Sequence, residues 1–146
     1  MLCFPNCKIN LGLYVTGRRD DGYHNIATVF YPVQVNDVLE IVPGTEPRLH
    51  TSGLAINGNN ADNLVWKAYR LMRESCPGMI PPLDIYLHKA IPMGAGLGGG
   101  SADGAFMLRL LNDTYKLQFS KEQLAELALQ LGSDCPFFIY NTPEFA

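Results

Sequence analysis

Long apolar runs and blocks of basic charge are both missing from this sequence. No stretch of the 146 residues approaches the roughly 18 consecutive apolar residues that a membrane-spanning helix needs. The 11 Lys and Arg residues are outnumbered by 14 Asp and Glu residues, and they form no cluster that would bind nucleic acid or a membrane surface. The first residues lack the basic segment and apolar core of a secretory signal. We therefore expect a cytoplasmic protein with no membrane and no nucleic-acid partner.

Closely spaced pairs of metal ligands are also missing. A structural zinc site usually combines two such pairs. Only Cys3 and Cys7 lie close together, and the other candidates are scattered along the chain: Cys76, Cys135, His24, His50 and His88. We predict no metal site, and we expect the cysteines to be reduced, small, buried residues.

Apolar periodicity and turn residues predict a single α+β domain. Strands are expected at residues 7–16, 24–35, 38–42, 48–51 and 83–88, with a final strand at 136–140. Helices are expected at 63–75, from 101 or 102 to 112, and from 121 to about 132. Most strands precede the helices, unlike the regular alternation of a parallel α/β fold. The length also corresponds to one domain.

Helix starts are marked by polar residues. Asp62 can cap the first helix and Ser101 the second, and Ser120 with Gln123 has the spacing of a capping box. Trp66 lies at helical spacing and is interpreted as a core residue, and we assign His50 and His88 to structure as well.

A glycine-rich segment, Pro92–Gly104, separates the strand at 83–88 from the second helix. Six of its thirteen residues are Gly, which lets several backbone N–H groups point at one anion. A helix that starts at the end of the segment adds free N–H groups and a positive dipole end. The segment therefore predicts a phosphate-binding loop; the alternative is a flexible linker. The residues assigned to phosphate binding are Pro92, Gly94, Ala95, Gly96, Leu97, Gly98, Gly99, Gly100, Ser101 and Ala102.

Two common phosphate loops fit this segment poorly. A P-loop needs Lys before its Ser or Thr, and here Gly100 leads directly into Ser101. The dinucleotide pattern G-x-G-x-x-G is present at Gly94, Gly96 and Gly99. That motif requires a second parallel strand ending in an acid about 20 residues later, whereas a second helix is predicted there.

The segment resembles the nucleotide loop of the GHMP kinases (galactokinase, homoserine, mevalonate and phosphomevalonate kinases), whose signature is Pro-x-x-x-Gly-Leu-Gly-Ser-Ser-Ala. Its form Gly-Leu-Gly-Gly-Gly-Ser-Ala-Asp is similar to one branch, the 4-diphosphocytidyl-2-C-methyl-D-erythritol kinases. Further blocks carry the same resemblance in family order, so that it covers nearly the whole chain: Lys8–Leu11, Thr16–His24, Asp62–Leu64 and Leu131–Phe138.

The resemblance implies a fold and a reaction. The fold is the GHMP-kinase N-terminal domain (ribosomal protein S5 domain 2-like), with a mixed or antiparallel sheet and helices on one face. The reaction is the transfer of phosphate from ATP, with Mg²⁺, to a hydroxyl of 4-diphosphocytidyl-2-C-methyl-D-erythritol on the non-mevalonate route to isoprenoid precursors. The partners it implies are therefore ATP and this small-molecule substrate.

The resemblance also implies residue roles. Lys8 and Asp134 correspond to the catalytic pair, in which Asp134 takes or eases the proton of the substrate hydroxyl. Read without the family, Lys8 is an exposed strand residue and Asp134 a turn residue. The substrate positions are Asn10, Tyr23 and His24, and the positions around the adenine are Asn63, Leu64 and Lys89. Cys7 stands where the family usually has Ala, a modest change in volume.

GHMP kinases carry a second domain with another Gly-rich block, and this sequence has none. We therefore expect residues 1–146 to be the N-terminal ATP-binding domain, inactive or nearly so without the C-terminal domain. Two alternatives stay open: another GHMP kinase acting on a small alcohol such as homoserine or mevalonate, and a non-catalytic nucleotide-binding module. The sequence does not predict the oligomeric state.

Overall fold

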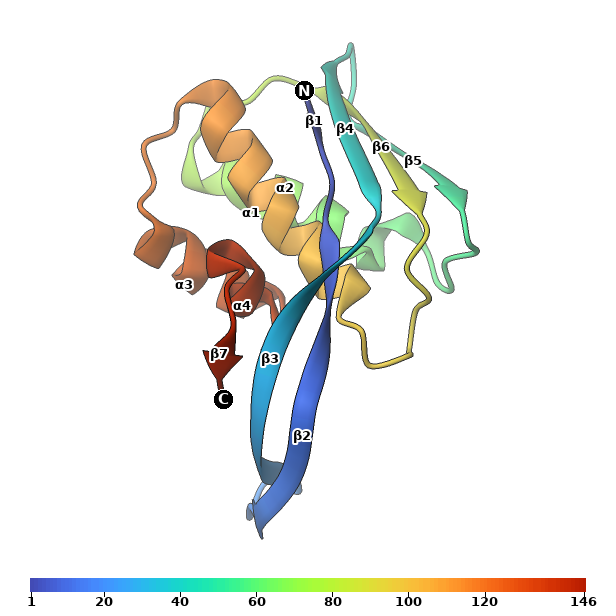
Figure 1. The fold of residues 1–146 in the computed structure, drawn as a ribbon. Coiled ribbons are helices and arrows are strands. Elements are labelled where there is room, and N and C mark those ends of the chain that lie inside the picture. The colour runs from blue at the N-terminus through green and yellow to red at the C-terminus, as the bar shows by residue number, and fades with distance from the viewer.

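Two sheets joined by long, bent strands organise the chain (Figure 1). The computed structural model describes all residues, 1–146. The strands are β1 (Leu2–Cys3), β2 (Asn6–Arg18), β3 (His24–Asn36), β4 (Val38–Pro43), β5 (Arg48–Gly53), β6 (Leu83–Lys89) and β7 (Glu144–Phe145). The helices are the 3₁₀ turn η1 (Asn60–Asp62), α1 (Leu64–Ser75), α2 (Gly99–Tyr115), α3 (Lys121–Leu131) and α4 (Cys135–Tyr140).

The first sheet has the order β1-β4-β6-β5 and is mixed, because only β5 and β6 run parallel. Side chains of β6 alternate between its two faces, and Leu83, Ile85 and Leu87 are buried. The helices lie on one side of this sheet (Figure 1), and a single apolar core joins sheet and helices. The predicted α+β class, with a mixed sheet covered on one face, is confirmed.

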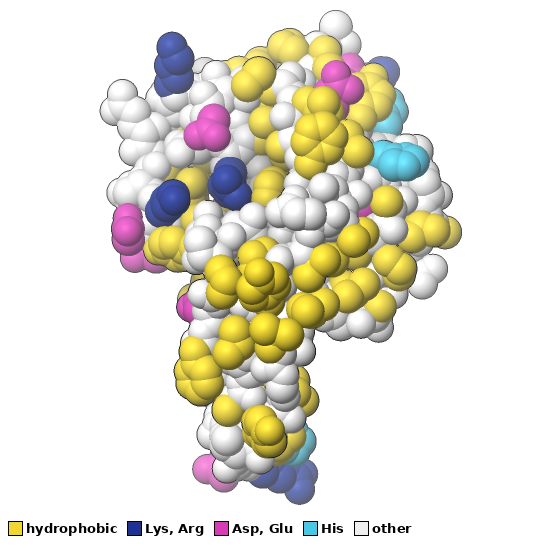
Figure 2. Space-filling view, in the orientation of Figure 1, with side chains coloured by type: hydrophobic (Ala, Val, Ile, Leu, Met, Phe, Trp, Pro, Cys, Tyr) yellow, Lys and Arg dark blue, Asp and Glu magenta, His cyan; other side chains and the backbone are white.

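The second sheet is a long antiparallel hairpin of β2 and β3 that extends away from the core, with the short β7 paired to β3 (Figure 1). Apolar side chains are exposed along it (Figure 2). These side chains are Ile9, Leu11, Leu13, Tyr14, Val15, Ile26, Tyr31, Val35 and Phe145. A two-stranded ribbon covers little apolar surface by itself.

Two helix starts differ from the sequence prediction. Asn63, not Asp62, caps α1, because its Oδ1 accepts the N–H of Val65. Helix α2 begins at Gly99, so Ser101 lies inside the first turn and is not the N-cap. The predicted capping box of α3 is confirmed, with Ser120 and Gln123 exchanging hydrogen bonds. The longest helix, α2, has 17 residues, and no helix combines the length and the apolarity needed to cross a bilayer.

The predicted final strand at 136–140 is wrong, because these residues form α4. Pro136 lies in the first turn of this helix, where its fixed φ suits a helix and its missing N–H breaks no bond. The apolar run Phe137–Ile139 is buried against the other helices. A short apolar run has the same appearance in a strand and in a buried helical turn.

Candidate functional site

The glycine loop between β6 and α2 presents backbone to solvent. Gly94, Gly96 and Gly98 all have positive φ, between 69° and 75°, which is a region that favours Gly. The first helical bond of α2 runs from Ala102 N to Gly98 O, and no side chain caps this helix. The N–H groups of its first turn therefore have no carbonyl partner within the helix. They lie at the positive end of a long helix, which makes this a suitable site for an anion.

The loop is attached to β2 at the predicted catalytic lysine. The backbone N of Lys8 donates to Leu97 O at 2.9 Å. A Cβ on Gly98 would lie 3.0 Å from Phe138 and 3.3 Å from Lys8 Cε. Only Gly allows such a close approach in this backbone conformation. Lys8 is therefore held against the end of the loop from which α2 starts.

The ammonium of Lys8 is surrounded by three groups. It donates to Asn10 Oδ1 at 2.7 Å and lies 4.0 Å from Asp134 Oδ2. It also lies 4.5 Å from the ring centroid of Phe30, on the paired strand β3. The Lys8 side chain is 7% exposed and that of Asp134 is 40% exposed, so the pair opens to solvent on the Asp134 side. The structure thus brings Lys8, Asn10 and Asp134 together, and adds Phe30, which the sequence analysis missed.

Asp134 is positioned by α4. It is the N-cap residue of this helix, and Asn141 ends the helix in a left-handed conformation. Asn6, at the start of β2, exchanges two amide hydrogen bonds with Asn141, of 3.1 and 2.7 Å. The strand that carries Lys8 and the helix that carries Asp134 are therefore tied directly to each other. The sequence held no local signal for this amide pair, because 135 positions separate its members.

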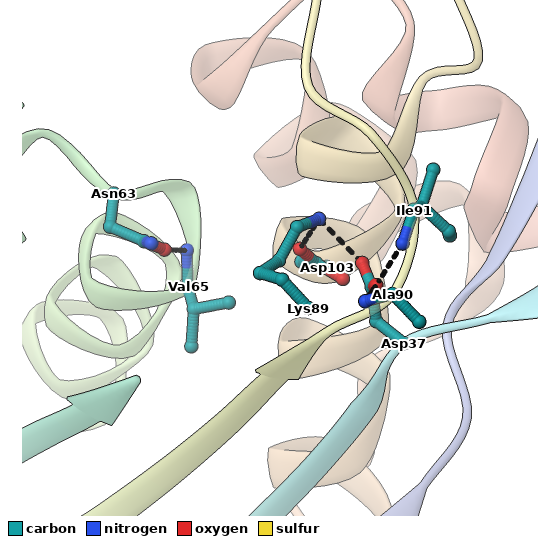
Figure 3. A network of polar contacts seen from close by, with 7 residues as sticks. All are labelled: Asp37, Asn63, Val65, Lys89, Ala90, Ile91 and Asp103. Atoms are coloured by element: carbon teal, nitrogen blue, oxygen red, sulfur yellow. Dashed lines mark hydrogen bonds and ion pairs between the residues drawn. The ribbon is translucent and has the colours of Figure 1, made fainter. Parts of the chain in front are cut away.

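The predicted adenine residues line one pocket beside the glycine loop. Asn63, Leu64 and Lys89 share this pocket of about 150 Å³ with Gly100 and Asp103. The Lys89 ammonium does not point freely into it, because it is bonded to Asp37 and Asp103 (Figure 3). Asn63 and Leu64 stand at the start of α1.

A buried charged cluster lies beneath this pocket. Lys89 Nζ is 2.5 Å from Asp37 Oδ2 and 2.8 Å from Asp103 Oδ2, and all three side chains are at most 3% exposed. Burial lowers the pKa of Lys89, but the Asp103 and Asp37 carboxyl groups outweigh it and raise the pKa overall. The sequence analysis gave no role to either aspartate, although Asp103 lies within the Pro92–Gly104 segment. One signal was available: Lys89 continues the buried alternation of Leu83, Ile85 and Leu87.

Tyr23 and His24 lie at the far end of the hairpin, away from Lys8. His24 pairs with Arg18, whereas Lys8 pairs with Pro32. At about 3.3 Å per residue, the ten positions from Lys8 to Arg18 span roughly 30 Å. Tyr23 is 72% exposed. The structure therefore does not bring these two residues next to the Lys8–Asp134 pair.

Metal-ligating side chains are not gathered anywhere. No group of three or more His, Cys, Asp or Glu side chains is arranged to hold an ion. All four cysteines are free, and burial raises the pKa of Cys3 to about 12. Few side-chain oxygens lie next to the loop, among them the exposed carboxylate of Asp134 and the hydroxyl of Ser101, so a Mg²⁺ ion here would depend largely on oxygens of the phosphates that it accompanies.

A glycine loop at the start of a long helix, with a lysine–aspartate pair beside it, gives this α+β domain an arrangement suited to an anion such as a phosphate group. Residues 63–142 match the family described as the GHMP kinases N terminal domain. The chain belongs to this family.

Named relatives and solved structures agree with this assignment. Proteins called 4-diphosphocytidyl-2-C-methyl-D-erythritol kinase from Bacteroides fragilis and Parabacteroides distasonis are 55% and 53% identical over the whole chain. A crystal structure of 4-(cytidine 5'-diphospho)-2C-methyl-D-erythritol kinase is 38% identical with a TM-score of 0.83, and the chain covers 51% of it. Mevalonate kinase from Methanococcus jannaschii, at 14% identity and a TM-score of 0.70, shares the fold. The chain spans about half the length of the relatives, 54% and 53% of those two proteins.

Proposed function

We propose that this chain is the N-terminal, ATP-binding domain of a 4-diphosphocytidyl-2-C-methyl-D-erythritol kinase. The full protein would phosphorylate a hydroxyl of that substrate with ATP, a step in making isoprenoid precursors. The observation that carries the proposal is the contact between the glycine loop and the Lys8–Asp134 pair. Relatives with that printed name, at 50% identity or more over the chain, support the choice of substrate.

Phosphoryl transfer needs the phosphates held, the developing charge neutralised and the hydroxyl aligned. The N–H groups of the loop and of the first turn of α2 would hold the phosphates, and the Ser101 hydroxyl can add a further bond. Asp134 would accept the proton of the substrate hydroxyl or ease its loss, and its 40% exposure leaves it accessible. The Lys8 ammonium, 4.0 Å from Asp134 Oδ2, would stabilise negative charge on the attacking oxygen. Asn10 fixes the direction of that ammonium.

The nucleotide base and Mg²⁺ are assigned by the same reasoning. The pocket lined by Asn63 and Leu64 lies next to the loop and can take the adenine, with Lys89 beneath it. Mg²⁺ would neutralise phosphate charge, and its protein ligands here are few. Tyr23 and His24 suit the cytosine through stacking and hydrogen bonding, and this assignment requires the far end of the hairpin to come closer to Lys8 when the substrate binds.

The missing part of the site is supplied, we propose, by the second half that the relatives possess. The hairpin exposes a row of apolar side chains (Figure 2), and large apolar patches usually mark interaction surfaces. A second domain on the hairpin would cover this row and close the site over Lys8 and Asp134.

The test uses a chimera of residues 1–146 with the second half of the Bacteroides fragilis relative. We expect turnover of ATP with 4-diphosphocytidyl-2-C-methyl-D-erythritol and not with mevalonate or homoserine. Lys8→Ala and Asp134→Asn should each lower kcat/KM by roughly 10²–10⁴-fold, the usual contribution of such groups. The matched control, Lys121→Ala at the exposed start of α3, should change it less than twofold.

Other results would replace this proposal. Near-normal kcat/KM in both Lys8→Ala and Asp134→Asn would show that these two residues are not the catalytic pair. Turnover of mevalonate or homoserine alone would make the protein another GHMP kinase. Tight ATP binding with no turnover by the chimera would favour a non-catalytic nucleotide-binding module.

A further inference from the structure

The buried cluster of Asp37, Lys89 and Asp103 joins the two ends of the glycine loop. Asp37 Oδ1 accepts the backbone N–H groups of Ala90 and Ile91, at 2.7 and 2.9 Å, directly before the loop. Asp103 belongs to the second turn of α2, directly after the loop. Lys89 bridges the two carboxyl groups (Figure 3). The cluster therefore connects the strand that enters the loop with the helix that leaves it.

The charges of this cluster do not cancel if both aspartates are ionised. Two carboxylates and one ammonium would leave one net negative charge on side chains that are at most 3% exposed. An uncompensated buried charge is costly, and a buried group usually changes its protonation state instead. The cluster would also place that negative charge beneath a loop built to bind an anion.

One atom of the cluster lacks a hydrogen-bond partner. Asp103 Oδ1 is buried and accepts no bond, whereas each oxygen of Asp37 accepts at least one. A protonated carboxyl group has one O–H donor, which a carboxylate lacks. Asp37 and Asp103 accept from the same ammonium through their Oδ2 atoms, so the Asp37 carboxyl group is a neighbouring acceptor for a proton on Asp103.

We infer that Asp103 is held in its acid form and donates its proton to the Asp37 carboxylate, so that Asp37, Lys89 and Asp103 form a neutral, proton-sharing triad that positions the glycine loop. The positioning role rests on the proposed nucleotide site, whereas the protonation does not. Burial raises the pKa of Asp103 well above its usual range, and the hydrogen bond to Asp37 raises it further. Burial also raises the pKa of Asp37, but hydrogen bonds from Asp103, Lys89 and two backbone amides outweigh it and lower the pKa overall.

The other groups that face Asp103 do not supply the missing positive charge. Cys3, on β1, is a neutral thiol, because burial raises its pKa to about 12. Arg109, further along α2, donates to the backbone oxygen of Phe138 and stacks on Phe106. A proton on Asp103, shared with Asp37, is thus what makes the net charge of the cluster zero.

Two isosteric substitutions in the 146-residue chain separate this triad from an ordinary double ion pair. In Asp103→Asn the amide can donate to Asp37 and accept from Lys89, as the acid does. In Asp37→Asn the acceptor of Ala90 N, Ile91 N and Lys89 is lost. Asp84→Asn, on the solvent side of the same strand β6, is the control.

The first measurement is the carboxyl ¹³C NMR signal of each aspartate between pH 5 and 8, assigned by the two variants. We expect Asp103 to show the shift of a protonated acid throughout and Asp37 that of a carboxylate. Two ionised signals, or a protonated Asp37 with an ionised Asp103, would overturn the protonation.

The second measurement is hydrogen exchange at the amides of Ala90, Ile91 and Ala102. We expect the protection factors of these three amides in Asp103→Asn and in the control to stay within threefold of the parental values. In Asp37→Asn the protection factors should fall more than tenfold. The loss should include Ala102, across the loop, which a purely local role for Asp37 would leave unchanged. Equal losses in Asp103→Asn and Asp37→Asn, or protection of Ala102 unchanged in both, would overturn the positioning role. If Asp37→Asn does not fold, the signals of the parent still decide the protonation, and Asp37→Glu replaces it in the exchange measurement.

Neither readout requires nucleotide or turnover. A failure of the triad therefore leaves the proposed kinase function untouched. The reverse also holds: an inactive chimera would not alter the carboxyl signals.

Discussion

The charge of Lys8 is held by a small set of neighbours. Its ammonium has one hydrogen bond to Asn10, a carboxylate at 4.0 Å and the face of Phe30 at 4.5 Å. The ring attracts the cation through its quadrupole and excludes water on that side. It is in turn fixed by edge contact with Phe137, at 5.4 Å between centroids. Phe30 is therefore expected to direct Lys8 toward Asp134.

Phe30→Leu should lower kcat of the chimera about two- to fivefold with little change in KM, because a cation–π contact contributes about 0.5–1 kcal/mol. Phe30→Tyr keeps the aromatic face and should restore at least half of the parental rate. Tyr31→Leu, an exposed neighbour on the same strand, is the matched control. A loss in Phe30→Tyr as large as that in Phe30→Leu would show that packing, and not the aromatic face, sets the rate.

At the scale of elements, the glycine loop combines two separable requirements. Gly98 meets a backbone requirement, with φ of 69° and with Phe138 and Lys8 within 3.3 Å of any added Cβ. Gly100 has open space around it, lies in the helix and lines the pocket beside the loop. The two positions should respond differently to the same methyl group.

Gly98→Ala should destabilise the chain by about 2 kcal/mol, since a left-handed conformation alone costs an L-residue roughly 1–2 kcal/mol. Gly100→Ala should leave stability unchanged or raise it by up to about 1 kcal/mol through helix propensity, yet weaken ATP binding. Urea unfolding and ATP titration of both variants measure this. Tight ATP binding by Gly100→Ala would mean that the nucleotide does not use this pocket.

Local patterns predict the elements that have local causes. The β6–loop–α2 order, the Ser120 capping box and the strands of the hairpin were all predictable, because alternation, capping spacing and Gly density act over a few residues. Residues 136–140 were not, since only burial against other helices decides between strand and helical turn for such a run. Within the site, the family blocks predicted Lys8 and Asp134. The triad could not be predicted from the sequence, because Asp37 and Asp103 come close together only when β4 pairs with β6 and α2 packs on the sheet.

For the whole molecule, the exposed hairpin and the open site are two features that the proposed second domain would explain together. Apolar side chains along β2 and β3 face solvent (Figure 2), and Asp134 is open on the side that Lys8 does not cover. The relatives are nearly twice as long as the chain. A second domain covering the hairpin would satisfy both features, which predicts that activity and burial of the hairpin appear together.

The most direct test is transfer of labelled γ-phosphate from ATP to 4-diphosphocytidyl-2-C-methyl-D-erythritol, measured for residues 1–146 alone and for the chimera at equal concentration. The chain alone should transfer phosphate at least 10³-fold more slowly than the chimera, because under the proposed function its loop and its Lys8–Asp134 pair would need the second half of the protein to complete the site. Equal rates would contradict the account, and so would a chimera that binds both ligands and transfers nothing.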